Sequence, residues 1–295
     1  MFVILGATGK IGSATISALR EAGTPVRAVV RDPSKTEPLA ALGCEIAIAD
    51  LQDKVSLARA FDGAAAVQII CPTNPQAEDA LAEMRRSIEV VGEALENVRP
   101  STVLAISDYG AELSAGTGVT VAFYALEERL RHISSPLIIL RSAEHMENWS
   151  RFIKVAAKTG VLQSLHHPLT KRFPTVSAFD VGTIAAQLLL SAPKIGISPR
   201  IVHVEGPRRY TPEDVAKAMG AVLRREVVPY ELPRTEWAAT LRRGGLSENY
   251  AQLIIELYDT HNSGRIDAQD GVGEIRRGHT DLTDALRPLV PAAQD

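Results

Sequence analysis

Three glycines near the N-terminus, in the segment GATGKIG at residues 6–12, constrain the fold of this chain more than any other feature. The segment follows a short β-branched run, Phe2–Leu5, and leads into a helical pattern. Gly6 can make the tight turn out of the strand, Gly9 lets the backbone approach a pyrophosphate, and Gly12 lets the helix pack on the sheet. Free N–H groups at the helix start offer hydrogen bonds to phosphates. The spacing is a variant of the dinucleotide-binding fingerprint G-x-G-x-x-G.

The first half of the chain alternates short apolar runs with helical periodicity. Helical patterns cover residues 11–22, 35–42, 54–60, 77–97 and 119–133. Strands are predicted at Phe2–Leu5, Val26–Val30, Glu45–Ala49, Ala66–Ile70, Val103–Ile106 and Leu137–Leu140. This alternation predicts βαβ units, a parallel sheet and a doubly wound arrangement. We therefore expect an α/β Rossmann-type fold, with residues 1–145 as the NADP(H)-binding domain.

After about residue 145 the pattern becomes a mixture of helices and strands. One helix start is well marked: Thr211 can cap it, Pro212 suits the first helical position, and Asp214 can complete a capping box. The expected helices lie at 177–190, 212–222, 235–242, 247–259 and 281–289, and the expected strands at 201–204 and 227–231. Residues 146–295 are predicted to form mainly a smaller α+β lobe over the cofactor. Segments near 175–205 are expected to complete the Rossmann sheet.

Composition and charge exclude several classes of function. Lys and Arg total 32 against 35 Asp and Glu, a net charge of −3, whereas nucleic-acid modules carry a clearly basic face. Arginine pairs such as Arg208-Arg209 and Arg276-Arg277 are expected to be solvated. Two cysteines, Cys44 and Cys71, cannot make a disulfide framework or a metal knuckle, so no metal site is expected.

The sequence also predicts the cellular compartment of the protein. No apolar run approaches the roughly 20 residues that span a bilayer. No signal peptide is expected, because residues 1–5 already form the first strand. We predict a cytoplasmic protein that binds neither membrane nor nucleic acid directly.

The end of the second strand predicts which dinucleotide is bound. NAD sites place Asp or Glu about 20 residues after the glycine loop to hold the ribose 2′-hydroxyl, whereas NADP sites use Arg. Arg31 ends this strand and Lys35 follows one turn later, a pair of cations that suits a 2′-phosphate. Asp32 competes with this assignment, but it should point elsewhere and can cap the following helix. NADP(H) is therefore preferred over NAD(H).

Two further strand ends are expected to border the cofactor. Asp50 and Leu51 follow the third strand, where the Asp50 carboxylate can accept from the adenine amino group or cap the helix at 54–60. Cys71 and Pro72 follow the fourth strand and should line the cofactor groove, with Cys71 as a packing residue. The predicted cofactor-binding residues are Gly6, Thr8, Gly9, Lys10, Ile11, Gly12, Arg31, Lys35, Asp50, Leu51, Cys71, Pro72 and Ser107.

Eight short segments along the chain carry a resemblance to a known family. In the first half they are GATGKIG at 6–12, VVRDP at 29–33 and ADL at 49–51; the others lie within 140–148, 176–182, 205–207, 262–264 and 277–282. Together they resemble the NmrA-like family, atypical relatives of the short-chain dehydrogenases/reductases. The resemblance covers nearly the whole chain. The family includes NADPH-dependent quinone reductases and NADP(H)-sensing regulators, so the resemblance implies NADP(H) binding and one of these two roles.

The catalytic pair of typical short-chain dehydrogenases is missing. Those enzymes use Tyr-x-x-x-Lys, in which the lysine lowers the tyrosine pKa. No tyrosine here has a lysine at that spacing, and no lysine occurs between Val55 and Ile153. By the resemblance, Phe123 stands where many family members carry a pocket lysine. Helix geometry places Tyr124 nearly opposite the buried stripe, as a surface residue.

The remaining catalytic candidates are Ser107 and Tyr109, just after the fifth strand, and His145, after the sixth. By the resemblance, His145 matches a position close to the cofactor; the alternative is a hydrogen-bonded pocket histidine without chemistry. A quinone can accept hydride directly, so an acid is useful but not essential, and carbonyl or alcohol chemistry has less support. His166-His167 lacks other suitably spaced ligands and is expected in a surface loop.

Two functions of different kinds fit these observations. The first, which we favour, is an NADPH-dependent reductase of quinone-like electrophiles, with the cofactor as the chemical agent and a small-molecule electrophile as the partner. The second is a non-catalytic NADP(H) sensor that acts through a regulatory protein partner, and the missing Tyr–Lys pair favours it. The oligomeric state stays open, with a homodimer as one option.

Overall fold

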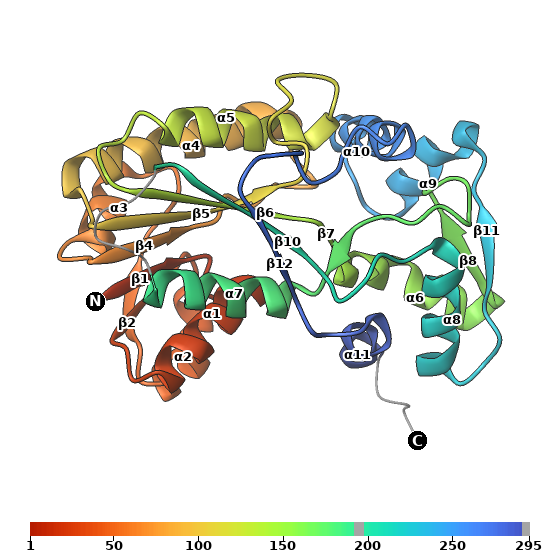
Figure 1. Cartoon of the computed structure of the whole chain (residues 1–295), viewed down its shortest axis with the longest axis horizontal. Coiled ribbons are helices and arrows are strands. Elements are labelled where there is room, and N and C mark those ends of the chain that lie inside the picture. The colour runs from red at the N-terminus through yellow and green to blue at the C-terminus, as the bar shows by residue number, and fades with distance from the viewer. Residues whose placement is uncertain (192–197, 291–295) are drawn as a thin grey trace.

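A parallel eight-stranded sheet forms the centre of the molecule (Figure 1). The computed structural model describes residues 1–191 and 198–290. The sheet order is β12-β10-β6-β5-β4-β1-β2-β3. Its strands are β1 (Phe2–Leu5), β2 (Val26–Val30), β3 (Glu45–Ile48), β4 (Ala66–Ile69), β5 (Thr102–Asp108), β6 (Leu137–Ser142), β10 (Arg200–Glu205) and β12 (Glu274–Arg277).

Helices cover both faces of this sheet (Figure 1). One face carries α1 (Lys10–Glu21), α2 (Glu37–Ala41) and α7 (Ala178–Leu190), and the other carries α3 (Lys54–Phe61), α4 (Ala80–Val98) and α5 (Val121–Leu130). Successive strand residues face opposite sides, so Ile4 and Leu104 belong to one apolar core while Val3 and Val103 belong to the other. Burial on both faces explains why the central strands are almost entirely apolar.

The later part of the chain packs beyond the carboxyl ends of the strands (Figure 1). Trp149, Phe173, Trp237 and Tyr258 contribute to a third apolar core there. Its elements are β7 (Glu144–His145), α6 (Ser150–Thr159), β8 (Val161–Ser164), β9 (Thr175–Val176), α8 (Pro212–Leu223), β11 (Val228–Glu231), α9 (Trp237–Arg243), α10 (Glu248–Asn262) and α11 (Leu282–Leu286). Strand β11 pairs with β8, and β7 pairs with β9. Short 3-10 turns are η1 (Pro33–Lys35), η2 (Gly118–Thr120), η3 (Met146–Trp149), η4 (Arg234–Glu236) and η5 (Arg287–Leu289).

The predicted doubly wound α/β fold is confirmed, and so is the capping box at the start of α8. Among the described α-helices and strands, five were not predicted: β12, α6, β8 and the two-residue strands β7 and β9. Strand β12 has the sequence EIRR at an edge of the sheet, so it lacks the buried apolar pattern that marks the central strands. Helix α6 does carry a signal, because its buried residues Phe152, Ile153 and Ala156 have helical spacing. The third missed element, β8, is a four-residue strand that pairs only with β11.

The strand order has a topological switch point beside β1. Strand β1 pairs with β2 on one side and with β4 on the other, so the connections leave it in opposite directions. Ligands of open α/β sheets bind in the crevice outside the carboxyl ends of the strands at such a point. The glycine segment leaves β1 at this end and begins α1.

Helix α7 packs directly against the backbone of α1. At Gly182, a Cβ atom would lie 2.4 Å from the carbonyl oxygen of Ile11 and 2.9 Å from the nitrogen of Thr15. The Thr15 hydroxyl also donates a 3.1 Å hydrogen bond to the Gly182 carbonyl. The lack of a side chain at Gly182 thus permits close packing of the two helices.

Two carboxylates, Glu147 and Asp180, connect the start of α7 to other parts of the chain. Glu147 accepts hydrogen bonds from the Ser177 hydroxyl (2.8 Å) and the Ala178 nitrogen (3.0 Å), at the start of α7. Asp180 accepts from the nitrogen and the hydroxyl of Thr280, each at 2.9 Å. Segments on either side of α7 in the sequence are therefore tied to its first turn.

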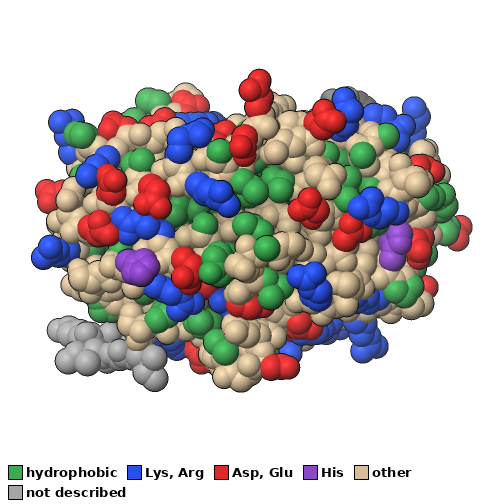
Figure 2. All heavy atoms as spheres, turned by 90° about the horizontal axis from the view of Figure 1, so that it is seen from above, with side chains coloured by type: hydrophobic (Ala, Val, Ile, Leu, Met, Phe, Trp, Pro, Cys, Tyr) green, Lys and Arg blue, Asp and Glu red, His purple; other side chains and the backbone are tan. Residues whose placement is uncertain are grey.

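Charged side chains of both signs are interspersed on the face seen in Figure 2. The expectation that the arginine pairs are simply solvated is wrong for Arg209 and Arg277. Both donate to Glu205, which is buried, at 2.7 and 3.0 Å. The negative charge of Glu205 has to be compensated because it is out of contact with water. No helix in the described part of the chain is long and apolar enough to cross a membrane.

Candidate functional site

The glycine loop has the backbone geometry of a phosphate cradle. Gly6 has φ of +71°, which favours glycine, and the Gly9 nitrogen donates a 3.0 Å hydrogen bond to the Gly6 carbonyl. A Cβ on Gly12 would lie 2.2 Å from that same carbonyl oxygen. Helix α1 begins at Lys10 without a side-chain cap, so its first N–H groups are available to an anion. The loop therefore fits a dinucleotide pyrophosphate.

The exposed cations expected at the end of β2 are in place. Arg31 and Lys35 are both exposed and, among the described residues, neither forms an ion pair. Asp32 caps η1 as predicted, because its carboxylate accepts from the nitrogen (3.0 Å) and the hydroxyl (2.8 Å) of Ser34. The Ser34 hydrogen bonds lower the pKa of Asp32. This carboxylate is thus engaged by Ser34 and forms no ion pair with either cation.

Asp50 does not cap the helix that follows it. Its carboxylate accepts from the Gln52 nitrogen at 2.8 Å, in a local turn, while Asp53 caps α3 through the Val55 nitrogen at 2.9 Å. Asp50 is exposed and Leu51 is half-buried. The alternative of a helix cap at Asp50 is therefore wrong, and its contact with adenine stays a prediction.

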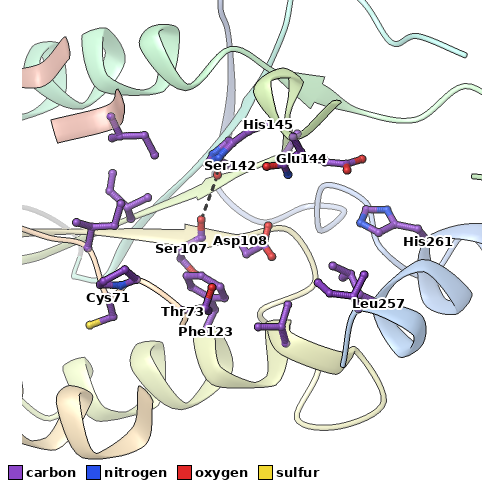
Figure 3. A pocket seen from close by; sticks show the side chains of 18 of the residues that line it. Cys71, Thr73, Ser107, Asp108, Phe123, Ser142, Glu144, His145, Leu257 and His261 are labelled. Carbon is purple, nitrogen blue, oxygen red and sulfur yellow. Dashed lines mark hydrogen bonds between the residues drawn. The ribbon is translucent and has the colours of Figure 1, made fainter. Parts of the chain in front are cut away.

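A cavity of about 350 Å³ lies at the carboxyl ends of the central strands. Figure 3 shows that side chains from β5, β6, β7, α5 and α10 converge on it. It adjoins α1 through Ile11. Of the predicted residues, Ile11, Cys71, Pro72, Ser107 and His145 line it. The full lining is Ile11, Ile70, Cys71, Pro72, Thr73, Ile106, Ser107, Asp108, Val119, Phe123, Ser142, Ala143, Glu144, His145, Asn148, Arg151, Tyr250, Ile254, Leu257, Tyr258 and His261.

Tyr109 does not line this cavity, so its prediction as a site residue is wrong. It follows β5 directly, so it turns to the other face of the sheet from Asp108. There it is 1% exposed and donates a 3.2 Å hydrogen bond to Glu205. Its ring meets that of His203 edge-on, with centroids 5.4 Å apart. Burial and the Glu205 carboxylate raise the pKa of Tyr109. We therefore assign Tyr109 to packing.

Ser107 is held by a buried ion pair. Its hydroxyl donates to Glu127 at 2.6 Å. The guanidinium of Arg141 donates to both oxygens of Glu127, at 2.8 and 2.7 Å, and each of these two residues is 1% exposed. A hydroxyl committed to a carboxylate in this way is fixed in position. Ser107 can thus orient a bound molecule through its remaining lone pair.

His145 lies in the cavity wall next to Ser142 (Figure 3). The Ser142 hydroxyl is within hydrogen-bond distance of both the Ser107 carbonyl oxygen (3.3 Å) and His145 Nε2 (3.2 Å). Burial lowers the pKa of His145, although the carboxylates of Glu147 and Glu144 oppose this effect. The ring is therefore neutral at physiological pH.

The expectation that His166 lies in a surface loop is wrong. It is 1% exposed and stacks on Phe173, with centroids 3.9 Å apart. Its Nε2 atom lies 2.7 Å from Glu144, which also accepts a 2.7 Å hydrogen bond from the Tyr258 hydroxyl. Burial raises the pKa of Glu144, but His166 and His261 outweigh this and lower it to about 2. Glu144 is therefore an anion held between two partners.

His261 completes the far wall of the cavity. Burial and the neighbouring His166 lower its pKa to about 4, so its ring is neutral. At the opposite wall, burial raises the pKa of the Cys71 thiol to about 12, which excludes a thiolate nucleophile. The neutral His261 ring and the protonated Cys71 thiol therefore do not provide the activated nucleophile that covalent catalysis needs.

Asp108 also lines the cavity, although it is not among the residues predicted from the sequence. It is the last residue of β5 and points into the cavity, as Figure 3 shows. Its carboxyl accepts a 2.8 Å hydrogen bond from Thr120. Burial raises its pKa to about 7, with Glu144 adding to the effect and the hydrogen bond from Thr120 opposing it. A signal was available, because Asp108 stands at the carboxyl end of a parallel strand next to Ser107.

Helix α5 presents Phe123 to the cavity, as its position beside the buried stripe predicts. A phenyl ring thus lies where a lysine is expected from the family resemblance. Tyr124 is half-buried, and therefore less exposed than predicted; it lines a small hollow together with Glu112 and Arg131. Thr73 and Glu144 also line the cavity, next to the predicted residues Pro72 and His145. Two more polar lining residues, Tyr250 and Tyr258, come from α10, where the sequence gave no sign of a site.

Comparisons with known proteins agree with this architecture. The NAD(P)H azoreductase of Xenophilus azovorans is 24% identical over 259 residues, 88% of this chain and 86% of the relative. Quinone oxidoreductase 2 of Escherichia coli K12 is 22% identical over 258 residues, 87% of this chain and 86% of the relative. The Citrobacter sp. triphenylmethane reductase complexed with NADP(H) superposes with a TM-score of 0.79 at 19% identity, over 98% of this chain and 99% of the other. The model of the NmrA-like family matches residues 1–275, and the chain belongs to that family.

Proposed function

We propose that this protein is an NADPH-dependent reductase of quinone-like electrophiles. The observation that carries the proposal is the cavity itself, which joins the start of α1 to a chamber lined by Phe123, Ile254 and Leu257. Apolar and aromatic side chains suit a planar acceptor, and polar groups at the strand ends can orient it. The names of the azoreductase and quinone oxidoreductase relatives support the same chemistry.

Residues 1–145 would hold the cofactor, and residues 146–295 would supply much of the acceptor wall. Gly6, Gly9 and Gly12 leave room for the pyrophosphate, and the start of α1 supplies N–H donors to it. Arg31 and Lys35 would take the 2′-phosphate, which favours NADPH over NADH. When bound, NADPH supplies a hydride to the acceptor.

The chain's own contribution is to position the acceptor and exclude water. Ser107, at the end of β5, and His145, on β7, lie at one side of the cavity and offer a fixed lone pair and a neutral ring. Both contact Ser142 through the hydrogen bonds described above. We propose that they orient the acceptor carbonyl rather than attack it. The Glu144–His166–Tyr258 cluster links β7 to α10 and fixes the cavity wall between them.

The decisive experiment follows nicotinamide absorbance over time with NADPH, purified protein and a panel of quinones. Loss of NADPH that depends on the protein and saturates with one quinone would support the reductase. If protein shown to bind NADPH by calorimetry turns over no quinone, the reductase proposal fails. The absence of turnover would also direct the search to protein partners of a sensor.

Arg31→Ala is expected to weaken NADPH binding by about 10–150-fold, because a charge-assisted contact of roughly 1.5–3 kcal/mol to the 2′-phosphate is lost. NADH affinity should change little. Calorimetric titration of both cofactors tests this, with Arg287→Ala, an exposed arginine on η5, as the control. Equal losses for NADPH and NADH would show that Arg31 does not contact the phosphate.

A further inference from the structure

We propose that Asp108 is the acid that delivers the proton needed to complete reduction of the bound electrophile. This inference rests on the proposed reductase function and adds to it the source of the proton. No Tyr–Lys pair is available for this step, and a protonated group in the cavity is a nearer source of the proton than bulk solvent.

The position of Asp108 suits this role. It stands at the carboxyl end of β5, where side chains of this fold meet a ligand. Its carboxyl group points into the middle of the cavity, between the β7 wall and Leu257 of α10 (Figure 3). The Thr120 hydroxyl, from η2, fixes one of its oxygens at 2.8 Å. Among the described residues, Asp108 forms no ion pair with Lys, Arg or His that would hold it as a carboxylate.

The groups that face Asp108 favour its neutral form. From β7, the carboxylate of Glu144 opposes a second negative charge, and Glu112, in the segment after β5, acts in the same direction. From α10, the Tyr250 hydroxyl stays protonated because burial raises its pKa. The Thr120 hydroxyl and the Tyr109 backbone N–H favour the carboxylate, but burial outweighs them. With a pKa of about 7, Asp108 is protonated in a large fraction of molecules at neutral pH.

Other cavity groups are poorer donors. Glu144 is ionised, since its pKa is about 2. His145 and His261 are neutral rings whose pKa values are lowered by burial. The Tyr258 proton is donated to Glu144, and the Cys71 thiol has a pKa of about 12. Asp108 combines a transferable proton with a place in the cavity.

The step balances without any further reactant. Hydride transfer adds two electrons and one hydrogen nucleus to the quinone, which leaves one substrate oxygen anionic. The O–H bond of the Asp108 carboxyl breaks as a new O–H bond forms on that oxygen, giving the hydroquinone. The Asp108 carboxylate then takes a proton from water before the next turnover.

Asp108→Asn tests the proposal through the pH profile of kcat/KM. In the parent protein kcat/KM should be highest below pH 7 and fall about tenfold per pH unit well above it, because the protonated carboxyl is the active form. The variant should lose about 100-fold at pH 6 and lose this pH dependence as well. NADPH affinity and melting temperature, measured in parallel, should stay near the parent values because asparagine has the same shape.

Glu112→Gln is the matched control, because it removes a nearby carboxylate that does not line the cavity. Its kcat/KM at pH 6 should equal that of the parent. The midpoint of its pH profile should shift to lower pH, because one of the negative charges that raise the pKa of Asp108 is gone. Thr120→Val provides a second variant whose midpoint should move up by about 0.5–1 pH unit, since the lost hydrogen bond favoured the carboxylate. An unchanged midpoint in Thr120→Val would overturn the assignment even if Asp108→Asn did not fold.

Infrared difference spectroscopy of the cofactor-bound protein gives a readout apart from turnover. A protonated carboxyl band that titrates near pH 7 and is missing in Asp108→Asn supports the proposal, and the absence of such a band overturns it. Quinone reduction with an unchanged pH profile in Asp108→Asn would overturn the role of Asp108 and leave the reductase intact. No quinone reduction by the parent protein would overturn both.

Discussion

Gly12→Ala is expected to weaken NADPH binding by about 100-fold or more and to lower stability as well. The added Cβ would lie 2.2 Å from the Gly6 carbonyl oxygen and 2.8 Å from its carbon, both of them backbone atoms. The start of α1 has to move away from the loop, which displaces the N–H donors from the pyrophosphate. Losing two charge-assisted hydrogen bonds costs about 1.5–3 kcal/mol each, and overpacking adds about 1–3 kcal/mol to the loss of folding stability.

Calorimetry with NADPH and thermal unfolding measure these two effects separately. Ser17→Ala is the control, because it lies on the same helix one turn beyond the loop and should leave both quantities near the parent values. A Gly12→Ala protein that binds NADPH as tightly as the parent would mean that the cofactor does not rest on this loop.

Glu127→Ala is expected to cost about 3–5 kcal/mol of folding stability, because it leaves the Arg141 guanidinium buried without its main partner. Glu112 still contacts Arg141 at 3.0 Å, but through one nitrogen only. The hydroxyl of Ser107 would also lose its acceptor. Urea or thermal unfolding measures the loss.

Glu128→Ala is the matched control for this prediction. Glu128 is the next residue on α5, and its side chain is 49% exposed and pairs with Arg131 at 3.2 Å. An exposed pair of this kind contributes about 0.2–1 kcal/mol. If the two variants unfolded at the same urea concentration, the buried Glu127–Arg141 pair would contribute no more to folding stability than the exposed pair, and the prediction would be wrong.

Much of the Rossmann sheet could be predicted because most of its strands and helices have recognisable patterns within their own short segments of sequence. Strands such as β1 and β2 are apolar runs, and the glycine segment has to follow a strand and open a helix. Helix α8 carried its own capping signals. Strand β12 gave no such signal, because its place in the sheet depends on pairing with β10 across more than 60 residues of sequence.

The candidate site was predicted only in part, for a related reason. Ile11, Cys71, Ser107 and His145 stand next to recognisable strands or loops, so topology alone places them at the cavity. His166 and Glu144 are brought together by tertiary packing, and the low pKa of Glu144 depends on that contact. Tyr109 lies outside the cavity because neighbouring strand residues face opposite sides of the sheet, and its position next to a strand end does not by itself indicate which side it takes.

Several segments that carry the family resemblance contain side chains that connect distant parts of the structure by hydrogen bonds. Glu147 and Asp180 hold the start of α7, while Glu205 gathers Arg209, Arg277 and Tyr109. A buried side chain that connects distant segments by hydrogen bonds can be replaced as little as a catalytic one, because its loss leaves polar groups without partners. A match to such motifs therefore identifies the family and says less about the reaction.

The contact of Gly182 with α1 bears on how such proteins can diverge. Helix α7 is encoded far downstream of the glycine segment, yet its backbone sets how close α1 can lie to the sheet. A chimera that joined the first 145 residues of one relative to the remainder of another would inherit two helices selected separately for this fit. The start of α1 and the α7 helix must therefore change together. We expect the cavity to be altered with least effect on this fit through α10, which lines it with Ile254, Leu257, Tyr258 and His261.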